Sequence, residues 1–176
     1  MATIVGIDIG KNSVDVAFFD GKCWHNQSFA QTEQGYETLC QVIGRDVEWV
    51  VMEATGSYFL KLACYLTEKN YPVAVLNPKM IHHYAKMRLS RAKTDKKDAQ
   101  LIARYGMDYH AELSAWQSDA EDIVALRQLQ SLQALLKAQK TMTTNHLEAL
   151  SQHPVQNQHT IEQINTLLDC LKQRLL

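Results

Sequence analysis

The chain has 176 residues, of which 46% are apolar, and carries a formal net charge of −1. This length holds about one average domain with an appendage, and the apolar fraction is ordinary for a soluble globular chain. No apolar run approaches the roughly 18–20 residues of a membrane span, and no basic flank marks a signal peptide, so we expect a cytoplasmic protein with no membrane partner.

The first part of the chain is expected to alternate between strands and helices. Residues 2–9 are apolar on both faces, which is typical of a central strand buried on two sides. Asp20-Gly21 is a hairpin signal, so the first three strands should form an antiparallel meander. A long basic connection should precede the last helix. The predicted elements are strands over residues 2–9, 13–19, 22–29, 47–53 and 71–78, with helices over 32–43, 58–70 and 94–105.

This order of elements predicts an α/β fold. It corresponds to a mixed sheet of about five strands flanked by helices, and it matches the ribonuclease-H-like topology. In that topology the strands 2–9 and 47–53 are central neighbours, and the helix 94–105 packs across them. Residues at the ends of these three elements should therefore meet.

Four acidic residues occupy those positions. Asp8 lies within the first strand, where burial disfavours a carboxylate that nothing compensates. Glu53 ends the strand 47–53, and Asp95 and Asp98 are three residues apart, so both can share one helix face. Hard oxygen ligands select Mg²⁺ or Mn²⁺, and two such ions can stabilise the attacking and leaving oxygens of a phosphodiester displacement. The sequence thus predicts a catalytic metal site formed by Asp8, Glu53, Asp95 and Asp98.

Each of these acids also has a purely structural interpretation. Asp8 precedes a turn in which an aspartate is ordinary turn chemistry. Glu53 is placed to favour the start of the following helix, because acids stabilise helix N-termini. Asp95 and Asp98 would do the same for their own helix after a Thr94 cap. The conjunction of two strand ends and one helical pair favours the metal site.

Basic residues are concentrated in one segment. Residues 79–104 hold eight basic and two acidic residues, although the whole chain has 18 basic and 19 acidic residues. A basic segment around two carboxylates fits a polyanion held beside a metal site, and a solvated helical face is the alternative. His82, His83 and Tyr84 are candidates for stacking on single-stranded bases, with packed or solvated side chains as the alternative. We expect phosphate contacts, by charge, from Lys79, Lys86, Arg88, Arg91, Lys93, Lys96 and Lys97.

The last part of the chain is predicted to be helical. Ser118 and Glu121 have the spacing of a capping box that opens a long helix, and the helix should break near His153-Pro154. A second helix then carries apolar residues at alternating three- and four-residue spacing. An antiparallel hairpin folding on itself and a coiled-coil arm that joins protein copies are both consistent with this pattern.

The four cysteines lie far apart in the sequence, and no two of the seven histidines have the spacing of a helical metal site. There is no C-x-x-C pair, no short zinc-type spacing and no pair of histidines four residues apart. We therefore expect reduced, mostly buried thiols. Tyr58 is expected to belong to the core rather than to a catalytic site.

Four motifs together carry a family resemblance. They resemble the DEDD-type transposases of one class of insertion sequences, which are relatives of the pilin-gene-inverting site-specific invertases. The resemblance covers about residues 1–107 and implies a RuvC-like domain whose metal-binding acids are Asp8, Glu53, Asp95 and Asp98. The motifs are Gly6-Ile7-Asp8-Ile9-Gly10-Lys11, Met52-Glu53-Ala54-Thr55-Gly56-Ser57-Tyr58, Asn77-Pro78 and Lys93-Thr94-Asp95-Lys96-Lys97-Asp98-Ala99.

The resemblance also implies a reaction and its partners. It implies DNA strand exchange directed by a structured guide RNA that bridges donor and target, performed with Mg²⁺ or Mn²⁺ by a dimer or tetramer. It implies a catalytic domain over residues 1–110 and a helical, coiled-coil oligomerisation segment over 118–176. Family members carry a further domain that supplies a serine nucleophile. This chain stops at Leu176, so no serine in it is nominated and complete recombination by this chain alone is not expected.

Two functions of other classes remain open from the residues alone. One is a non-catalytic scaffold that binds RNA or DNA, in which the acids are structural and the basic segment is the functional part. The other is a phosphotransferase of the actin and sugar-kinase type, because Asp8-x-Gly10-x-x-Ser13 followed by Asp20-Gly21 resembles the first phosphate loop of that class. Such proteins need two copies of the fold, and this chain holds one.

Overall fold

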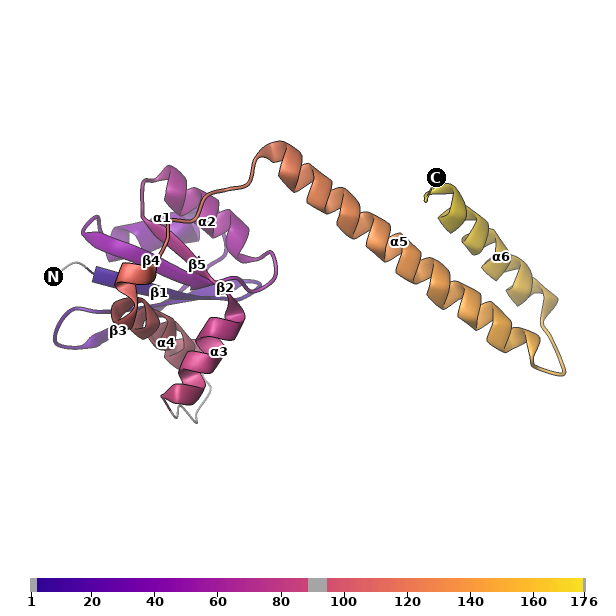
Figure 1. Ribbon diagram of the computed structural model, residues 1–176, viewed down its shortest axis with the longest axis horizontal. Helices are drawn as coiled ribbons and strands as arrows, with labels where there is room; N and C mark the ends of the chain where they lie inside the picture. The colour runs from indigo at the N-terminus through magenta and orange to yellow at the C-terminus, as the bar shows by residue number, and fades with distance from the viewer. Residues whose placement is uncertain (1–2, 89–94, 176) are drawn as a thin grey trace. The chain divides into compact units, whose positions relative to one another are not determined.

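The computed structural model describes residues 3–88 and 95–175, without the side chains of residues 95–97. The chain divides into two compact units, Met1–Ser118 and Asp119–Leu176. Figure 1 shows a sheet with its helices in the first unit and two long helices in the second. Within the described ranges, no helix combines the length and the apolar character that crossing a membrane requires.

The first unit is built on a five-stranded mixed sheet. Its strand order is β3-β2-β1-β4-β5. β1 pairs with β2 in antiparallel and with β4 in parallel orientation, and β5 continues the sheet parallel to β4. This arrangement confirms the predicted ribonuclease-H-like sheet. The strands are β1 (Thr3–Ile9), β2 (Ser13–Phe19), β3 (Trp24–Ala30), β4 (Val47–Glu53) and β5 (Val73–Leu76).

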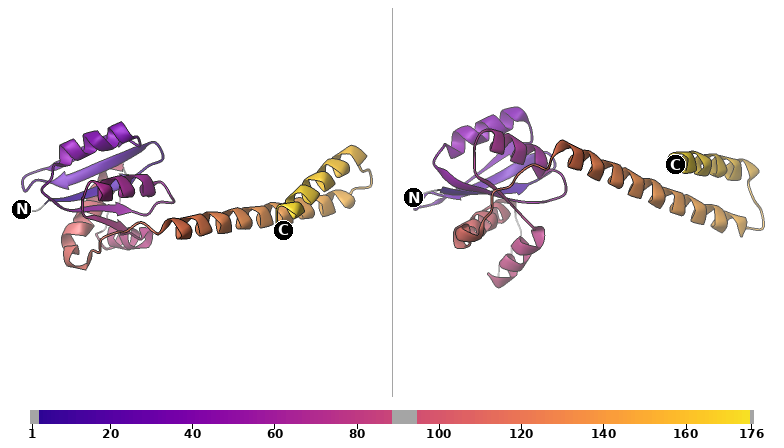
Figure 2. Two further views of the ribbon diagram at one scale, coloured as in Figure 1. Left: turned by 90° about the horizontal axis from the view of Figure 1, so that it is seen from above. Right: turned by 45° about the horizontal axis from the view of Figure 1, so that its top comes forward.

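Helices cover both faces of this sheet. One apolar core joins the sheet to α1 and α2, and a second core joins its other face to α3 and α4. Figure 2 shows the two helix pairs on opposite sides of the strands. The two cores follow from strand alternation, since Val5 and Ile7 belong to the first core and Ile4 to the second. The helices are α1 (Glu33–Ile43), α2 (Phe59–Glu68), α3 (Pro78–Met87) and α4 (Asp95–Asp108).

Two glycines allow α4 to lie directly against β1 and β4. A Cβ atom on Gly6 would be 2.3 Å from both the Ala103 nitrogen and the Ala99 oxygen of α4. A Cβ atom on Gly106 would be 2.8 Å from the Cγ2 atoms of Ile4 and Val51. No residue with a side chain fits at Gly6 unless the helix moves. The depth at which α4 packs is therefore set by the absence of side chains at these positions.

The second unit is a helical hairpin. α5 (Glu121–Ser151) ends just before the predicted break, and α6 (Gln158–Gln173) follows after a short turn. The Asn157 side chain caps α6 by accepting a hydrogen bond of 3.1 Å from the Thr160 amide. Leu168 and Leu171 are the buried residues of α6. They lie on the stripe whose three- and four-residue spacing predicted a packed helix.

Several local expectations are corrected by the structure. The segment after β5, predicted as a connection, forms α3, because Asn77 caps it through the Lys79 amide (2.9 Å) and Pro78 begins it. Helix α5 begins with Ala120 at its N-cap, rather than with Ser118 as predicted, and Ala120 makes no side-chain cap. Tyr58 is 46% exposed and so is not a core residue.

The cysteines also differ from expectation. All four are free, as predicted, but Cys23 and Cys170 are exposed and the other two are only partly buried.

Strand β3 begins two residues later than predicted, at Trp24. The reason is the Asp20 side chain, which accepts hydrogen bonds of 2.8 Å from both the Lys22 and Cys23 amides and so extends the turn.

Candidate metal centre

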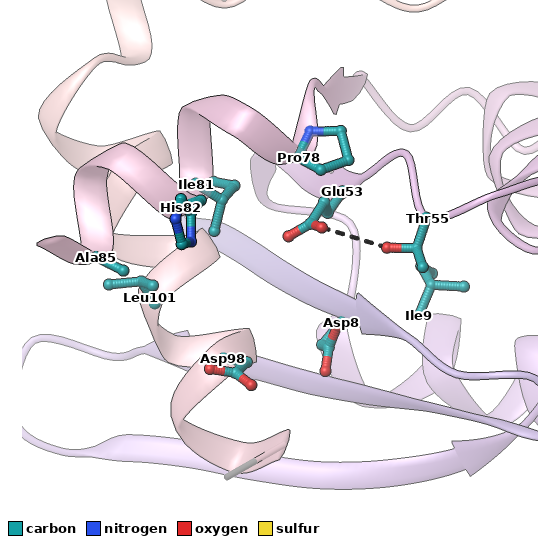
Figure 3. A pocket seen from close by; sticks show the side chains of 10 residues that line it. All are labelled: Asp8, Ile9, Glu53, Thr55, Pro78, Ile81, His82, Ala85, Asp98 and Leu101. Carbon is teal, nitrogen blue, oxygen red and sulfur yellow. Dashed lines mark hydrogen bonds between the residues drawn. The ribbon is translucent and has the colours of Figure 1, made fainter. Parts of the chain in front are cut away.

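Three of the four predicted acids line one pocket in the first unit. Asp8, Glu53 and Asp98 surround a cavity of about 370 Å³. Figure 3 shows these side chains bordering the same space from three different elements. All three are partly buried. The remaining lining residues are Ile9, Thr55, Pro78, Ile81, His82, Ala85 and Leu101.

Strand register brings Asp8 and Glu53 together. β1 and β4 are parallel, and Ile7 is the partner of Met52. Asp8 and Glu53 each follow this pair by one residue. Because side chains alternate along a strand, both carboxylates point to the face of the sheet opposite the buried Ile7 and Met52. That face is the one covered by α3 and α4.

Helix α4 brings Asp98 to the same place. Asp98 lies in the first turn of α4, immediately before Ala99, whose carbonyl oxygen packs over Gly6. Asp8 is two residues beyond Gly6 on β1, so the close packing of helix and strand sets the position of one carboxylate relative to the other. Asp95 is the first residue of α4, but its side chain lies outside the described residues.

The Glu53 carboxylate has a hydrogen-bond donor within the pocket. The Thr55 hydroxyl donates to Glu53 Oε1 at 3.4 Å, as the dashed line in Figure 3 marks. The turn after β4 also bends back on the sheet, since the Ala54 amide donates to the Leu76 carbonyl at 2.9 Å. These contacts hold the end of β4 next to the end of β5. They give Glu53 a defined direction toward the cavity.

Sequence reasoning missed one acid beside this site. Asp15 on β2 is the register partner of Asp8 in the antiparallel β1–β2 pair. Side chains of directly opposed residues lie on the same face, with Cβ atoms about 4.5–5.5 Å apart. Two carboxylates so placed repel each other unless a cation lies between or near them. The available signal was the turn at Lys11-Asn12, because counting outward from these two residues pairs Gly10 with Ser13 and then Asp8 with Asp15.

His82 adds an imidazole side chain to the wall of the pocket. It projects from α3 toward the cavity that Asp98 also lines. Sequence reasoning considered His82 and Tyr84 together as candidates for base stacking. The structure separates them, because His82 is exposed while Tyr84 is only 4% exposed. The two residues are two positions apart on α3, so they lie on different faces of the helix.

The predicted nucleic-acid contacts fall into three groups. Lys79 and Lys86 are exposed on α3, near the pocket wall formed by the same helix. Arg88 differs from them, because its guanidinium donates to Asp108 at 2.5 Å and lies 5.2 Å from the centre of the Tyr84 ring. Its charge is thus already compensated within the fold. Arg91 and Lys93 lie outside the described residues, as do the side chains of Lys96 and Lys97.

Tyr84, Arg88 and Asp108 form a polar cluster that joins the end of α3 to the end of α4. The Tyr84 hydroxyl donates to Asp108, which also accepts from Arg88. Burial, together with the hydrogen bond to Asp108, raises the pKa of Tyr84 to about 12. The hydrogen bond from Tyr84 and the adjacent Arg88 lower the pKa of Asp108. These contacts favour an ionised Asp108 and a neutral Tyr84.

The donor set of the pocket fits a hard divalent cation. Carboxylate oxygens are the ligands that Mg²⁺ and Mn²⁺ prefer, and three come from separate rigid elements. Partial burial strengthens the attraction of these charges for a cation relative to a fully solvated position. The pocket is therefore suited to hold Mg²⁺ or Mn²⁺ rather than a soft metal.

Comparison with known proteins gives a consistent result. Residues 5–153 match the profile of the IS110 DEDD family, which is described as a transposase family. Pilin gene-inverting proteins of Moraxella lacunata and Moraxella bovis are each 36% identical over 154 residues, or 85% of this chain and 47% of the relative. The chain thus spans about half the length of these curated relatives.

Solved structures of Thermus thermophilus RuvC are also similar. One of them, in complex with a Holliday junction substrate, has a TM-score of 0.48 and 13% identity, and covers 66% of this chain and 100% of its own length. Another has a TM-score of 0.49 and 15% identity, and covers 65% of this chain and 99% of its own length.

Proposed function

Because the chain belongs to the IS110 DEDD transposase family, we propose that its first unit supplies the divalent-metal-dependent step of DNA strand cleavage and exchange. The observation that carries this proposal is the convergence of Asp8, Glu53 and Asp98, from three elements, on one pocket. Asp95, one helical turn before Asp98, is proposed as the fourth ligand. The proposal is limited to this step because the chain spans about half of its relatives.

Each residue has a defined part in this scheme. Asp8, Glu53, Asp95 and Asp98 would hold one or two Mg²⁺ or Mn²⁺ ions, which when bound stabilise the attacking and leaving oxygens of a phosphodiester. The α4–β1 contact at Gly6 fixes the spacing of Asp8 and Asp98. The Thr55 hydroxyl orients Glu53. His82 lies where it can donate to, or accept from, a phosphate or water that enters the pocket.

We propose that nucleic acid reaches the pocket across α3 and the start of α4. Lys79 and Lys86 are exposed on α3, the helix that also supplies His82 to the pocket. The basic residues at 91, 93, 96 and 97 extend this charge in sequence toward Asp98. Positive charge of this kind attracts phosphates without reading bases. It suits a DNA substrate and also a structured guide RNA, which we propose as the source of target choice.

We further propose that copies of the chain associate through the second unit. Along the first half of α5, an apolar stripe is exposed that includes Leu126, Leu129, Leu132 and Leu135, at 50–63% exposure. In the second unit the buried residues belong to α6, and none belongs to α5. A parallel or antiparallel helix from a second copy would cover this stripe as a coiled coil. The relevant assembly is a dimer or a tetramer.

The metal-dependent step is tested by binding to a four-way DNA junction in the absence and presence of Mn²⁺. Without metal, the pocket carboxylates repel phosphates, so Asp8→Asn should bind the junction at least as tightly as wild type. With Mn²⁺, wild-type affinity should rise about tenfold, which corresponds to about 1.4 kcal/mol, and the variant should change little.

Asp46→Asn provides the matched control. Asp46 is an exposed acid just before β4, at the end of that strand opposite Glu53. The control should behave as wild type does. If Mn²⁺ raised the affinity of wild type and Asp8→Asn equally, the acids would not be the metal site, and a non-catalytic nucleic-acid scaffold would describe the chain better.

A further inference from the structure

A second group of possible metal ligands lies on the turn between β2 and β3. The ligand atoms of Asp20, Cys23 and His25 all lie within 4.8 Å of one another, and the three residues are exposed. Cys23 Sγ is 3.5 Å from His25 Nε2 and 3.7 Å from Asp20 Oδ2. His25 Nε2 is 2.7 Å from Asp20 Oδ2. A thiol, an imidazole and a carboxylate therefore converge on one point.

Two of the three separations match those of a tetrahedral zinc site. Zinc bonds of about 2.3 Å to sulfur and about 2.0–2.2 Å to nitrogen and oxygen place ligand atoms about 3.4–3.6 Å apart. The two distances from Cys23 Sγ, 3.5 and 3.7 Å, already lie near this range. Only the hydrogen bond between His25 and Asp20 has to lengthen, from 2.7 Å.

Local structure fixes two of the three ligands. The Lys22 and Cys23 amides both donate to Asp20 Oδ1 at 2.8 Å, which leaves Oδ2 directed at Cys23 and His25. The His25 ring stacks on Phe18, with ring centroids 5.0 Å apart and an interplanar angle of 16°. Because the carboxylate and the imidazole are held near their binding positions before any ion arrives, most of their conformational freedom is already lost before binding.

We propose that Asp20 Oδ2, Cys23 Sγ and His25 Nε2 bind one Zn²⁺ ion on the β2–β3 turn, with solvent as the fourth ligand. This site is separate from the acidic pocket, since none of its residues lines that pocket. Asp20 is five residues beyond Asp15 along β2, which corresponds to about 16 Å. On binding, the Cys23 thiol releases its proton to solvent, the Nε2 proton of His25 also leaves to solvent so that the imidazole keeps its proton on Nδ1, and the His25–Asp20 hydrogen bond is replaced by two metal bonds.

The two sites differ in the metals that they select. A thiolate and an imidazole favour Zn²⁺ and Co²⁺, whereas the all-carboxylate pocket favours Mg²⁺ and Mn²⁺. The zinc site retains one position for an exchangeable ligand, as sites with three protein ligands do. The turn can therefore be loaded with zinc without occupying the acidic pocket.

Cobalt titration of the full chain under reducing conditions tests the proposal. One equivalent of Co²⁺ should produce thiolate-to-cobalt charge-transfer absorption in wild type, and Zn²⁺ should displace it. Cys23→Ser should abolish the band, and His25→Gln should weaken Co²⁺ binding at least tenfold. Cys170→Ser, which removes the other exposed cysteine, and Asp8→Asn should leave the spectrum unchanged.

Alkylation of the unmodified chain gives a second readout that needs no variant. Zn²⁺ should slow the reaction of Cys23 with iodoacetamide at least tenfold and leave Cys170 unaffected, as measured on the two cysteine peptides by mass spectrometry. The proposal is overturned if Cys23→Ser retains the cobalt band, if wild type gives no band, or if Zn²⁺ protects both cysteines equally.

Discussion

The α carbon of Gly6 on β1 faces the backbone of Ala103 on α4 so closely that a Cβ atom on Gly6 would lie 2.3 Å from the Ala103 nitrogen. This contact determines how near the Asp98 carboxylate can come to Asp8, because each acid is on one of the two packed elements. A glycine in the centre of a sheet thus has a direct consequence for the candidate metal centre.

Gly6→Ala should therefore disrupt both packing and metal binding. The added methyl group meets backbone atoms, which cannot rotate away, so α4 must shift. We expect a loss of about 2–3 kcal/mol in the free energy of unfolding of the first unit, at the upper end for overpacked cores. Urea unfolding followed by tryptophan fluorescence measures this unit selectively, because Trp24, Trp49 and Trp116 all lie in it.

Gly21→Ala is the matched control. Nothing lies within 4 Å of a Cβ atom at Gly21, but its φ of +93° disfavours a side chain. We expect a loss of about 1 kcal/mol and unchanged Mn²⁺ affinity. If Gly6→Ala retained wild-type Mn²⁺ affinity, the spacing between α4 and β1 would not control the site.

Asp15→Asn should have opposite effects on stability and on metal affinity. Removing one of two opposed carboxylates relieves repulsion with Asp8, so the metal-free chain should gain about 0.5 kcal/mol in stability. The same change lowers the negative potential at the pocket, so Mn²⁺ affinity should fall several-fold. Thermal unfolding of the variant and of wild type, with and without Mn²⁺, measures both quantities. If the melting temperature of the variant differed from that of wild type by the same amount under both conditions, Asp15 would not belong to the site.

The Tyr84–Asp108 contact should make stability depend on pH at both extremes. The pKa of Asp108 is lowered in the folded chain, so its contribution is present above the unfolded value of about 3.9 and is lost as pH falls. The pKa of Tyr84 is raised to about 12, so its contribution is present below the unfolded value of about 10 and is lost as pH rises toward 12.

Asp108→Asn should therefore destabilise the first unit by about 1 kcal/mol at pH 7, the usual scale for such a hydrogen bond. The difference from wild type should shrink below about pH 4. Urea unfolding at pH 3.5, 5, 7 and 9 measures this dependence. If the difference in free energy of unfolding between wild type and Asp108→Asn stayed constant from pH 3.5 to pH 9, the ionised state of Asp108 would contribute nothing to stability.

Strand periodicity was sufficient to predict the sheet, because residues such as Val5 and Ile7 alternate with residues of the other face. It also located Asp8 and Glu53 at the ends of neighbouring strands. Asp15 and the zinc ligands were not predictable by spacing alone. The first depends on hairpin register, and Asp20, Cys23 and His25 meet only because a side-chain-capped turn brings them together. Exposure of Tyr58 likewise depends on where the following helix begins.

The association proposed for the second unit should depend on the exposed leucines of α5. Leu129→Glu places a charge in the middle of the apolar stripe, where Leu129 is 63% exposed. We expect sedimentation equilibrium to change from dimer or tetramer to monomer without loss of helical circular dichroism. Gln130→Glu adds the same charge beside the stripe and should not change the assembly. Identical assembly of wild type and Leu129→Glu would place the interface elsewhere.

The most direct test of the account is calorimetric titration of Mn²⁺ into wild type, Asp98→Asn and Asp46→Asn, each alone and with a saturating four-way DNA junction. We expect saturable heat for wild type and Asp46→Asn, and at least tenfold weaker binding for Asp98→Asn, which corresponds to about 1.4 kcal/mol or more. Equal heats for all three proteins, both with and without DNA, would contradict a metal centre formed by these acids.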